Sequence, residues 1–183
     1  MASDAPEYFS AYRNIAFRRE DRILEVRLHT PGGSLLWGAD PGSIYTQLGQ
    51  AFRDVAFDSE NKVVIFTGTG DAFCVGRNAA EYTEEVYFEN WHRIMREADD
   101  MLLGLLNIGV PVIAGVKRPP LIHSELAVLA DIAIAAESAE FRDTHMNNGV
   151  VPGDGCHAVW NLLLGRSRPP RYGHLLCAGR YPQ

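Results

Sequence analysis

The sequence predicts an α/β fold in which a largely parallel sheet is covered by helices. Two segments, residues 62–67 and 111–116, are apolar at most positions, which is typical of parallel strands buried on both faces. Segments with apolar residues at helical spacing lie between and after these strands. This alternation of strands and helices is the pattern of α/β proteins, and we expect a single domain over residues 1–183.

Regular structure is predicted to start with a hairpin. Residues 14–17 and 22–28 alternate apolar and polar side chains, which indicates two strands with one face in water, joined at residues 19–21. An amphipathic helix should follow, because apolar residues recur at helical spacing from Ile44 to Val55. Ser43 precedes this helix and is a candidate amino-terminal cap.

The remaining elements complete the alternation. A long helical pattern over residues 83–106 separates the two buried strands. Residues 124–129 predict a short helix, and residues 131–135 predict a further strand. The last apolar periodicity begins at Gly155 and predicts a helix through Leu164 and on towards Cys177.

Composition and charge exclude several classes of protein. The chain has 183 residues, of which 46% are hydrophobic and 22% charged, as in ordinary globular proteins. Its net charge is -6 and its pI is about 5.5, and no basic run occurs, so a nucleic-acid partner is not expected. No uninterrupted apolar run is long enough to cross a bilayer, so no membrane partner is expected either.

The cysteines and the amino terminus favour a reducing compartment. The three cysteines are Cys74, Cys156 and Cys177, and none of them forms a C-x-x-C pair that would indicate a zinc knuckle. The acidic segment at residues 1–7 lacks the apolar core of a secretory signal. We therefore expect a cytoplasmic protein without a disulfide framework.

An imidazole and a carboxylate flank a sharp bend near the carboxyl end. His145 and Asp154 are nine positions apart, and Pro152 and Gly153 between them prevent a continuous helix. The bend can bring the two side chains into contact, and a carboxylate on one ring nitrogen leaves the other nitrogen free to deprotonate water. The structural alternative is a histidine satisfied in its loop and an aspartate that caps the helix starting at Gly155, and spacing alone leaves both open.

A second polar group follows the second buried strand. His123 and Glu125 stand where a short helix begins, and strand carboxyl ends in α/β sheets commonly bind ligands. Backbone amides there could hold an oxyanion. The alternatives are a capping or surface imidazole and an acid that complements the helix dipole.

Metal and nucleophile chemistry are less favoured. The two histidines and two acids supply ligand types, but neither H-E-x-x-H nor paired C-x-x-C occurs, so we expect no metal. Phosphate-loop and dinucleotide fingerprints are absent too, so we expect no other cofactor. A triad through Ser124 lacks the G-x-S-x-G turn.

The order of several segments resembles the crotonase (enoyl-CoA hydratase/isomerase) superfamily. The segments are residues 62–68, 72–76, 111–114, 125–127 with 131–132, and 149–153. The resemblance implies a spiral of ββα units and assembly into a homotrimer or hexamer. It also implies that the carboxyl-terminal helical part is truncated, because family members continue through further helices.

Further details resemble the β-diketone hydrolases of the 6-oxocamphor hydrolase type within that superfamily. These details are residues 33–37, His123-x-Glu125, His145 and residues 151–157. The resemblance implies retro-Claisen hydrolysis of a cyclic β-diketone, in which His145 and Asp154 activate water and His123 holds the oxyanion. It further implies that Trp37, Tyr82 and Glu125 contact the substrate.

Two alternatives stay open. An enoyl-CoA hydratase or isomerase would use Glu125 but would carry a second glutamate at the position of His145, and its coenzyme-binding G-A-D-I element corresponds here to residues 76–79, Gly-Arg-Asn-Ala. A non-catalytic remnant of the fold is the third possibility, because the chain is short.

Overall fold

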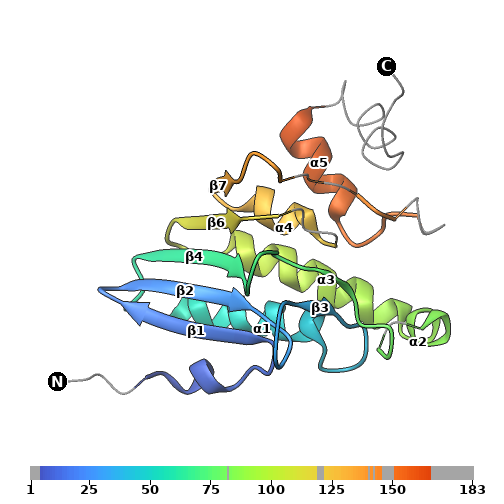
Figure 1. Cartoon of the computed structure of the whole chain (residues 1–183), viewed down its shortest axis with the longest axis horizontal. Helices are drawn as coiled ribbons and strands as arrows, with labels where there is room; N and C mark the ends of the chain where they lie inside the picture. Colours follow the sequence, from blue (N-terminus) through green and yellow to red (C-terminus); the bar gives the residue numbers. More distant parts are fainter. Residues whose placement is uncertain are drawn as a thin grey trace.

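The computed structural model describes residues 5–81, 83–118, 122–139, 141, 143–145 and 151–165. Within this part, five strands form one sheet in the order β1-β2-β4-β6-β7, and helices cover one of its faces (Figure 1). The elements are η1 (Glu7–Ser10), β1 (Ile15–Glu20), β2 (Ile23–Leu28), β3 (Leu36–Trp37), α1 (Ile44–Phe57), β4 (Val63–Gly68), β5 (Gly76–Arg77), α2 (Glu84–Glu89), α3 (Trp91–Leu106), β6 (Val112–Val116), α4 (Ser124–Leu129), β7 (Ile132–Ala135) and α5 (Cys156–Leu164). The α/β expectation is confirmed.

The predicted hairpin is present, but its turn lies one or two residues later than expected. β1 continues through Glu20, and the two strands pair antiparallel from Ile15 opposite Leu28 to Glu20 opposite Ile23. The connection is the two residues Asp21 and Arg22, whose φ angles are 47° and 67°. Positive φ at both central residues matches the twist of a tight hairpin, which explains why the strands extend to the turn.

The parallel part of the sheet is buried on one face only, which corrects the expectation of strands buried on both faces. β2, β4, β6 and β7 pair in parallel. Alternate residues of β4 and β6 point into the core, while those between them are half-buried, because α1 and α3 lie on the same side of the sheet (Figure 1). All four residues of β7 are exposed at the sheet edge.

The core lies between the sheet and the two long helices. Apolar side chains on one face of α1, including Leu48, Phe52 and Val55, are buried, as are Ile94 and Met101 of α3. Burying one large apolar side chain contributes about 1.5–3 kcal/mol, so this layer holds the two helices against the sheet.

One predicted capping bond is absent, and one predicted helix is divided in two. Ser43 stands at the cap position of α1, but its side chain makes no capping hydrogen bond. The helical pattern over residues 83–106 divides into α2 and α3 at Asn90, whose φ of -102° and ψ of 9° leave the helical range. Apolar periodicity alone does not record such a break.

A two-stranded sheet that the sequence did not reveal lies beyond the carboxyl ends of the main strands (Figure 1). β3 and β5 pair in parallel, Leu36 with Gly76 and Trp37 with Arg77. This pairing places Trp37 beside the candidate site. None of the helices in the described part of the chain combines the length and apolar character that crossing a bilayer requires. The expected truncation concerns helices after residue 183, and residues 166–183 lie outside the described part of the chain.

Candidate active site

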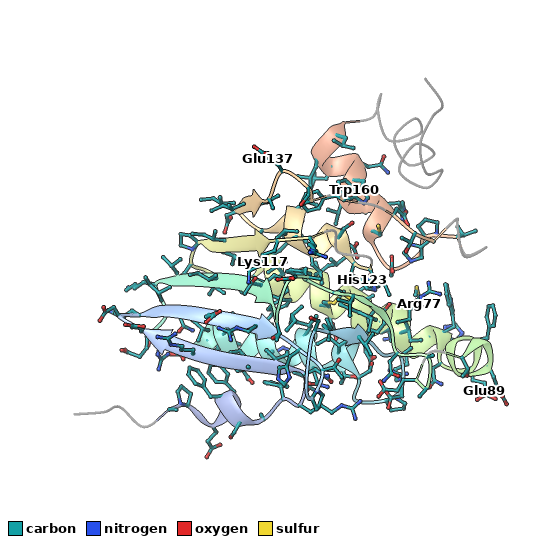
Figure 2. The ribbon with its side chains drawn as sticks, viewed as in Figure 1. Arg77, Glu89, Lys117, His123, Glu137 and Trp160 are labelled. Carbon is teal, nitrogen blue, oxygen red and sulfur yellow. The ribbon has the colours of Figure 1, made fainter. Side chains whose placement is uncertain are left out.

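His123 stands at the start of α4, after the carboxyl end of β6 (Figure 2). Its backbone is left-handed, with φ at 54°, a conformation that costs a non-glycine residue roughly 1–2 kcal/mol. The side chain is almost fully buried. A strained, buried histidine at a strand end is typical of a functional position.

Both ring nitrogens of His123 have buried partners. Nδ1 lies 2.5 Å from Oε1 of Glu125, and Nε2 lies 2.6 Å from the hydroxyl of Tyr45. The indole of Trp37 packs against the imidazole with ring centroids 4.2 Å apart. The ring is therefore held on every side and is not the free surface imidazole of the structural alternative.

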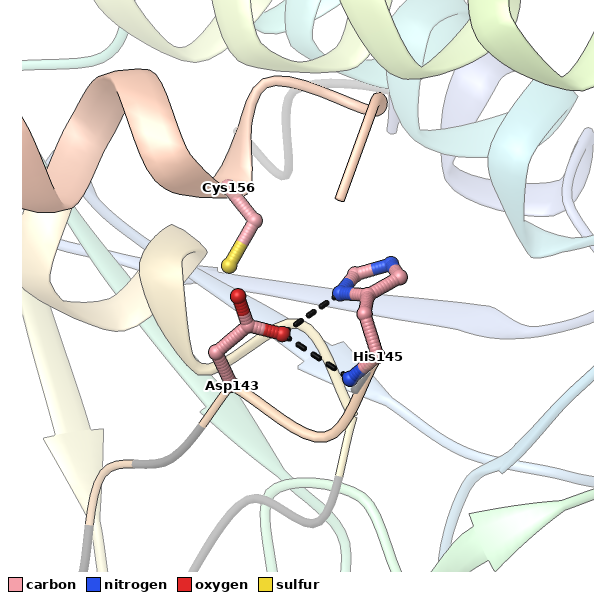
Figure 3. Close-up of side chains that lie close together, drawn as sticks. All are labelled: Asp143, His145 and Cys156. Carbon is pink, nitrogen blue, oxygen red and sulfur yellow. Dashed lines mark hydrogen bonds and ion pairs between the residues drawn. The ribbon is translucent and has the colours of Figure 1, made fainter. Parts of the chain in front are cut away.

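His145 and Asp154 are in contact, as the bend predicted. Nε2 of His145 lies 2.9 Å from Oδ2 of Asp154. The other ring nitrogen is not free, however, because Nδ1 lies 2.6 Å from Oδ1 of Asp143 (Figure 3). The imidazole is thus clamped between two carboxylates. This geometry corrects the expectation that one nitrogen remains available as a base.

The two carboxylates change the ionisation of this histidine. Burial lowers the pKa of His145, but hydrogen bonds to Asp143 and Asp154 outweigh burial and raise the pKa to about 10. Burial raises the pKa of Asp154, but the hydrogen bond from His145 and the proximity of both imidazoles lower it to about 2. At neutral pH the resting site therefore contains an imidazolium between two ionised carboxylates.

Asp154 connects the two histidines. Its Oδ2 lies 3.9 Å from Nδ1 of His123, while its Oδ1 accepts a hydrogen bond of 3.3 Å from the backbone amide of Cys156 at the start of α5. The sequence offered two roles for Asp154, a partner of His145 or a residue that bonds the start of the last helix. Asp154 fills both roles. The side chain of Asp154 is 1% exposed, whereas that of His145 is 16% exposed, so solvent reaches this network from the His145 side.

The expected substrate contacts have different outcomes. Glu125 is buried against His123 rather than facing an open space. Trp37 is fully buried, and among the described residues its Nε1 has no hydrogen-bond partner, which is uncommon for a buried donor. Tyr82 lies outside the described residues.

Sequence reasoning assigned no role to Tyr45 and Asp143. Asp143 carries a local signal, because an aspartate commonly bonds the backbone two residues on, and its Oδ1 accepts from the amide of His145 at 2.9 Å. Tyr45 carries none, since it occupies the apolar face of α1 and meets His123 only through a contact 78 residues apart in sequence.

The site contains side chains of the kinds that bind metal ions. Two groups of three such side chains lie close together, Asp143 with His145 and Cys156, and His123 with Glu125 and Asp154. Their imidazole nitrogens already have protein partners, so we assign no metal here. Burial and the neighbouring carboxylates raise the pKa of the Cys156 thiol far above its ordinary range, so this thiol is not a nucleophile.

Comparison with known proteins identifies the family. The family model for enoyl-CoA hydratase/isomerase matches residues 23–178. The chain belongs to this family. A probable peroxisomal enoyl-CoA hydratase of Arabidopsis thaliana is 28% identical over 156 residues, which are 81% of this chain and 57% of that protein. A probable enoyl-CoA hydratase of Mycobacterium tuberculosis is 32% identical over 133 residues, which are 68% of this chain and 47% of that protein.

Solved structures of the family share the crotonase fold. A β-diketone hydrolase from the cyanobacterium Anabaena sp. PCC 7120, bound to (S)-3-oxocyclohexyl acetic acid, is 38% identical with a TM-score of 0.85, covering 95% of this chain and 69% of that one. An enoyl-CoA hydratase/isomerase from Mycobacterium paratuberculosis is 23% identical with a TM-score of 0.78, covering 97% and 68%. The resemblance to crotonases is therefore confirmed, and the chain spans about half the length of the curated relatives it matches.

Proposed function

We propose that this protein hydrolyses a carbon–carbon bond of a cyclic β-diketone by a retro-Claisen reaction that needs no cofactor. The observation that carries the proposal is the partly buried contact between His145 and Asp154, with His123 beside the same carboxylate. The neighbour at 38% identity is a β-diketone hydrolase and was solved with a keto acid. Opening a cyclic β-diketone with water produces a keto acid, so the product of the proposed reaction belongs to the same chemical class as the molecule bound to that neighbour.

The reaction requires a path for one proton. Water oxygen bonds to a carbonyl carbon, the ring bond breaks with its electron pair going to the neighbouring carbon as an enolate, and a proton from water ends on that carbon. Nε2 of His145 is protonated at rest and donates to Asp154, so it can take a proton from water only after its own proton has passed to solvent and its bond to Asp154 has opened. Nδ1 stays bonded to Asp143, which keeps the ring in place, and Nε2 then returns the proton of water to the enolate carbon.

Trp37 and His123 are suited to the carbonyl oxygen. The indole Nε1 of Trp37 is a buried donor without a described partner, and a donor aimed at a developing oxyanion stabilises the tetrahedral intermediate. Both ring nitrogens of His123 already have protein partners, Nδ1 with Glu125 and Nε2 with the hydroxyl of Tyr45, so His123 can donate to the oxyanion only if its bond to Tyr45 opens. Tyr82, which lies outside the described residues, stays a candidate for substrate contact. Glu125 bonds His123, so we propose that it acts on the substrate through that histidine.

A second candidate is an acyl-CoA hydratase or isomerase. The family model and the names of the curated relatives favour this activity. Glu125 could serve as an acid or base, but its Oε1 is already engaged by His123 at 2.5 Å, and His145 stands where the resemblance places a second glutamate.

One comparison separates these functions. The purified chain is incubated with a bicyclic β-diketone and, separately, with an enoyl thioester of coenzyme A, and acyl-CoA binding is measured by calorimetry. Ring opening of the diketone without thioester hydration supports the proposal. Hydration of the thioester with tight acyl-CoA binding would support the acyl-CoA hydratase or isomerase instead. Turnover of neither substrate would support a non-catalytic remnant of the fold.

A further inference from the structure

Asp143 makes two hydrogen bonds to one residue. Its Oδ1 lies 2.6 Å from Nδ1 of the His145 ring and 2.9 Å from the backbone amide of the same histidine (Figure 3). The aspartate is buried, with 7% of its side chain exposed. One carboxylate therefore fixes both the backbone and the ring of His145.

The position of this carboxylate determines which way the ring faces. With Nδ1 held by Asp143, the opposite nitrogen points at Asp154, 2.9 Å away. Burial raises the pKa of Asp143, but the two bonds from His145 lower it below the ordinary value, so this carboxylate is ionised and can only accept. An imidazole between two acceptors must carry a proton on each nitrogen.

We infer that Asp143 is a positioning residue of the proposed reaction, which orients the His145 ring towards Asp154 and keeps it doubly protonated at rest. The inference rests on the proposed function for its catalytic meaning, but the orientation and the protonation are properties of the protein without substrate. Asp143 would thereby set the pH at which Nε2 becomes able to accept a proton from water.

Among the described residues, the charged and titratable groups around the ring come from three parts of the fold. Asp143 and Asp154 contact it directly from the loops before α5. Cys156 at the start of α5 lies close to the same acids. His123 and Glu125 from the start of α4 face Asp154 from the other side. Among these, Asp143 alone holds Nδ1, so its charge is the one to remove.

Asp143→Asn is the appropriate variant. The amide oxygen of asparagine can still accept the Nδ1 hydrogen bond, whereas the negative charge is lost. The control is Glu25→Gln, which removes one carboxylate that pairs with Arg27 on β2, away from the site. The readout is the titration of the His145 ring by nuclear magnetic resonance in the whole protein without substrate, assigned with His145→Gln.

The expected result is a fall of at least about one pH unit in the His145 midpoint of Asp143→Asn, with no change in Glu25→Gln. If the diketone is a substrate, the pH dependence of kcat shifts by the same amount, while KM changes little. An unchanged midpoint overturns the inference, because a structural aspartate would affect only stability.

A measurement on the unaltered protein covers the case in which Asp143→Asn does not fold. Nitrogen spectra at neutral pH should show a proton on both ring nitrogens of His145, and one bare nitrogen would overturn the inference. Neither measurement uses substrate, so a protein that fails on every diketone still tests the role of Asp143 separately from the proposed function.

Discussion

Oδ2 of Asp154 lies 2.9 Å from Nε2 of His145, and the segment between the two residues contains Pro152 and Gly153. The contact uses the ring nitrogen opposite to the one that Asp143 holds. Because Asp154 also bonds the amide that begins α5, the position of the helix and the position of the imidazole are linked.

Replacing either member of this contact should abolish turnover of a cyclic β-diketone. We expect His145→Gln and Asp154→Asn to lower kcat by about 10²–10⁴-fold, because proton transfer in the transition state contributes that much. Steady-state kinetics measures the loss, and far-ultraviolet circular dichroism checks the fold. Glu25→Gln is the charge-matched control, and near wild-type rates in either site variant would refute the mechanism.

The pH dependence of kcat should rise towards alkaline pH. If the proton acceptor is neutral His145, the rate increases with pH until the histidine is half neutral at a pH of about 10, and then levels off. A rate that instead falls as the pH approaches this value would show that the cationic ring is the active form.

Stability should depend on pH in the opposite direction. The pKa of His145 is raised from 6.5 to about 10 by folding, so its contribution is complete below pH 6.5 and is lost as the pH rises to about 10. The pKa of Asp154 is lowered from 3.8 to about 2, so its contribution is complete above pH 3.8 and is lost as the pH falls. Urea unfolding across both ranges, compared with His145→Gln, should show a difference that shrinks on alkaline titration.

Tyr45→Phe should destabilise the fold through His123. The change removes the hydroxyl from Nε2 and leaves a buried nitrogen unpaired, which costs about 1–3 kcal/mol. The control is Tyr12→Phe, which removes a less buried hydroxyl bonded to Asp54 and should cost less. If both variants lose the same free energy of unfolding in chemical denaturation, the bond to His123 stabilises the fold no more than the bond to Asp54 does.

Gly155→Ala should strain the loop that presents Asp154. Gly155 has φ at 88°, and a Cβ there would collide with the side chain of Leu102 on α3. The backbone term alone costs about 1–2 kcal/mol. Thermal unfolding should therefore show a loss that Leu102→Ala does not rescue, whereas Gly109→Ala, with open space around it, should be nearly neutral. Rescue by the leucine change would mean that steric contact dominates.

The contact between His145 and Asp154 was one of two outcomes that the sequence left open. Proline and glycine between residues nine positions apart exclude a continuous helix and permit the chain to bend back, but they do not require it. The strands and helices were predictable, because apolar periodicity is a property of neighbouring residues. The break at Asn90 was not, since a single turn of irregular backbone leaves the periodicity intact.

Amino-acid order alone thus determined the α/β alternation, the family and the residues of the bend. Only the tertiary structure decided which nitrogen of His145 meets which acid, that Tyr45 and Trp37 enclose His123, and that the sheet is covered on one face. The physical reason is range: a contact such as that between Tyr45 and His123 depends on how α1 packs against the sheet, and no spacing along the chain encodes that packing.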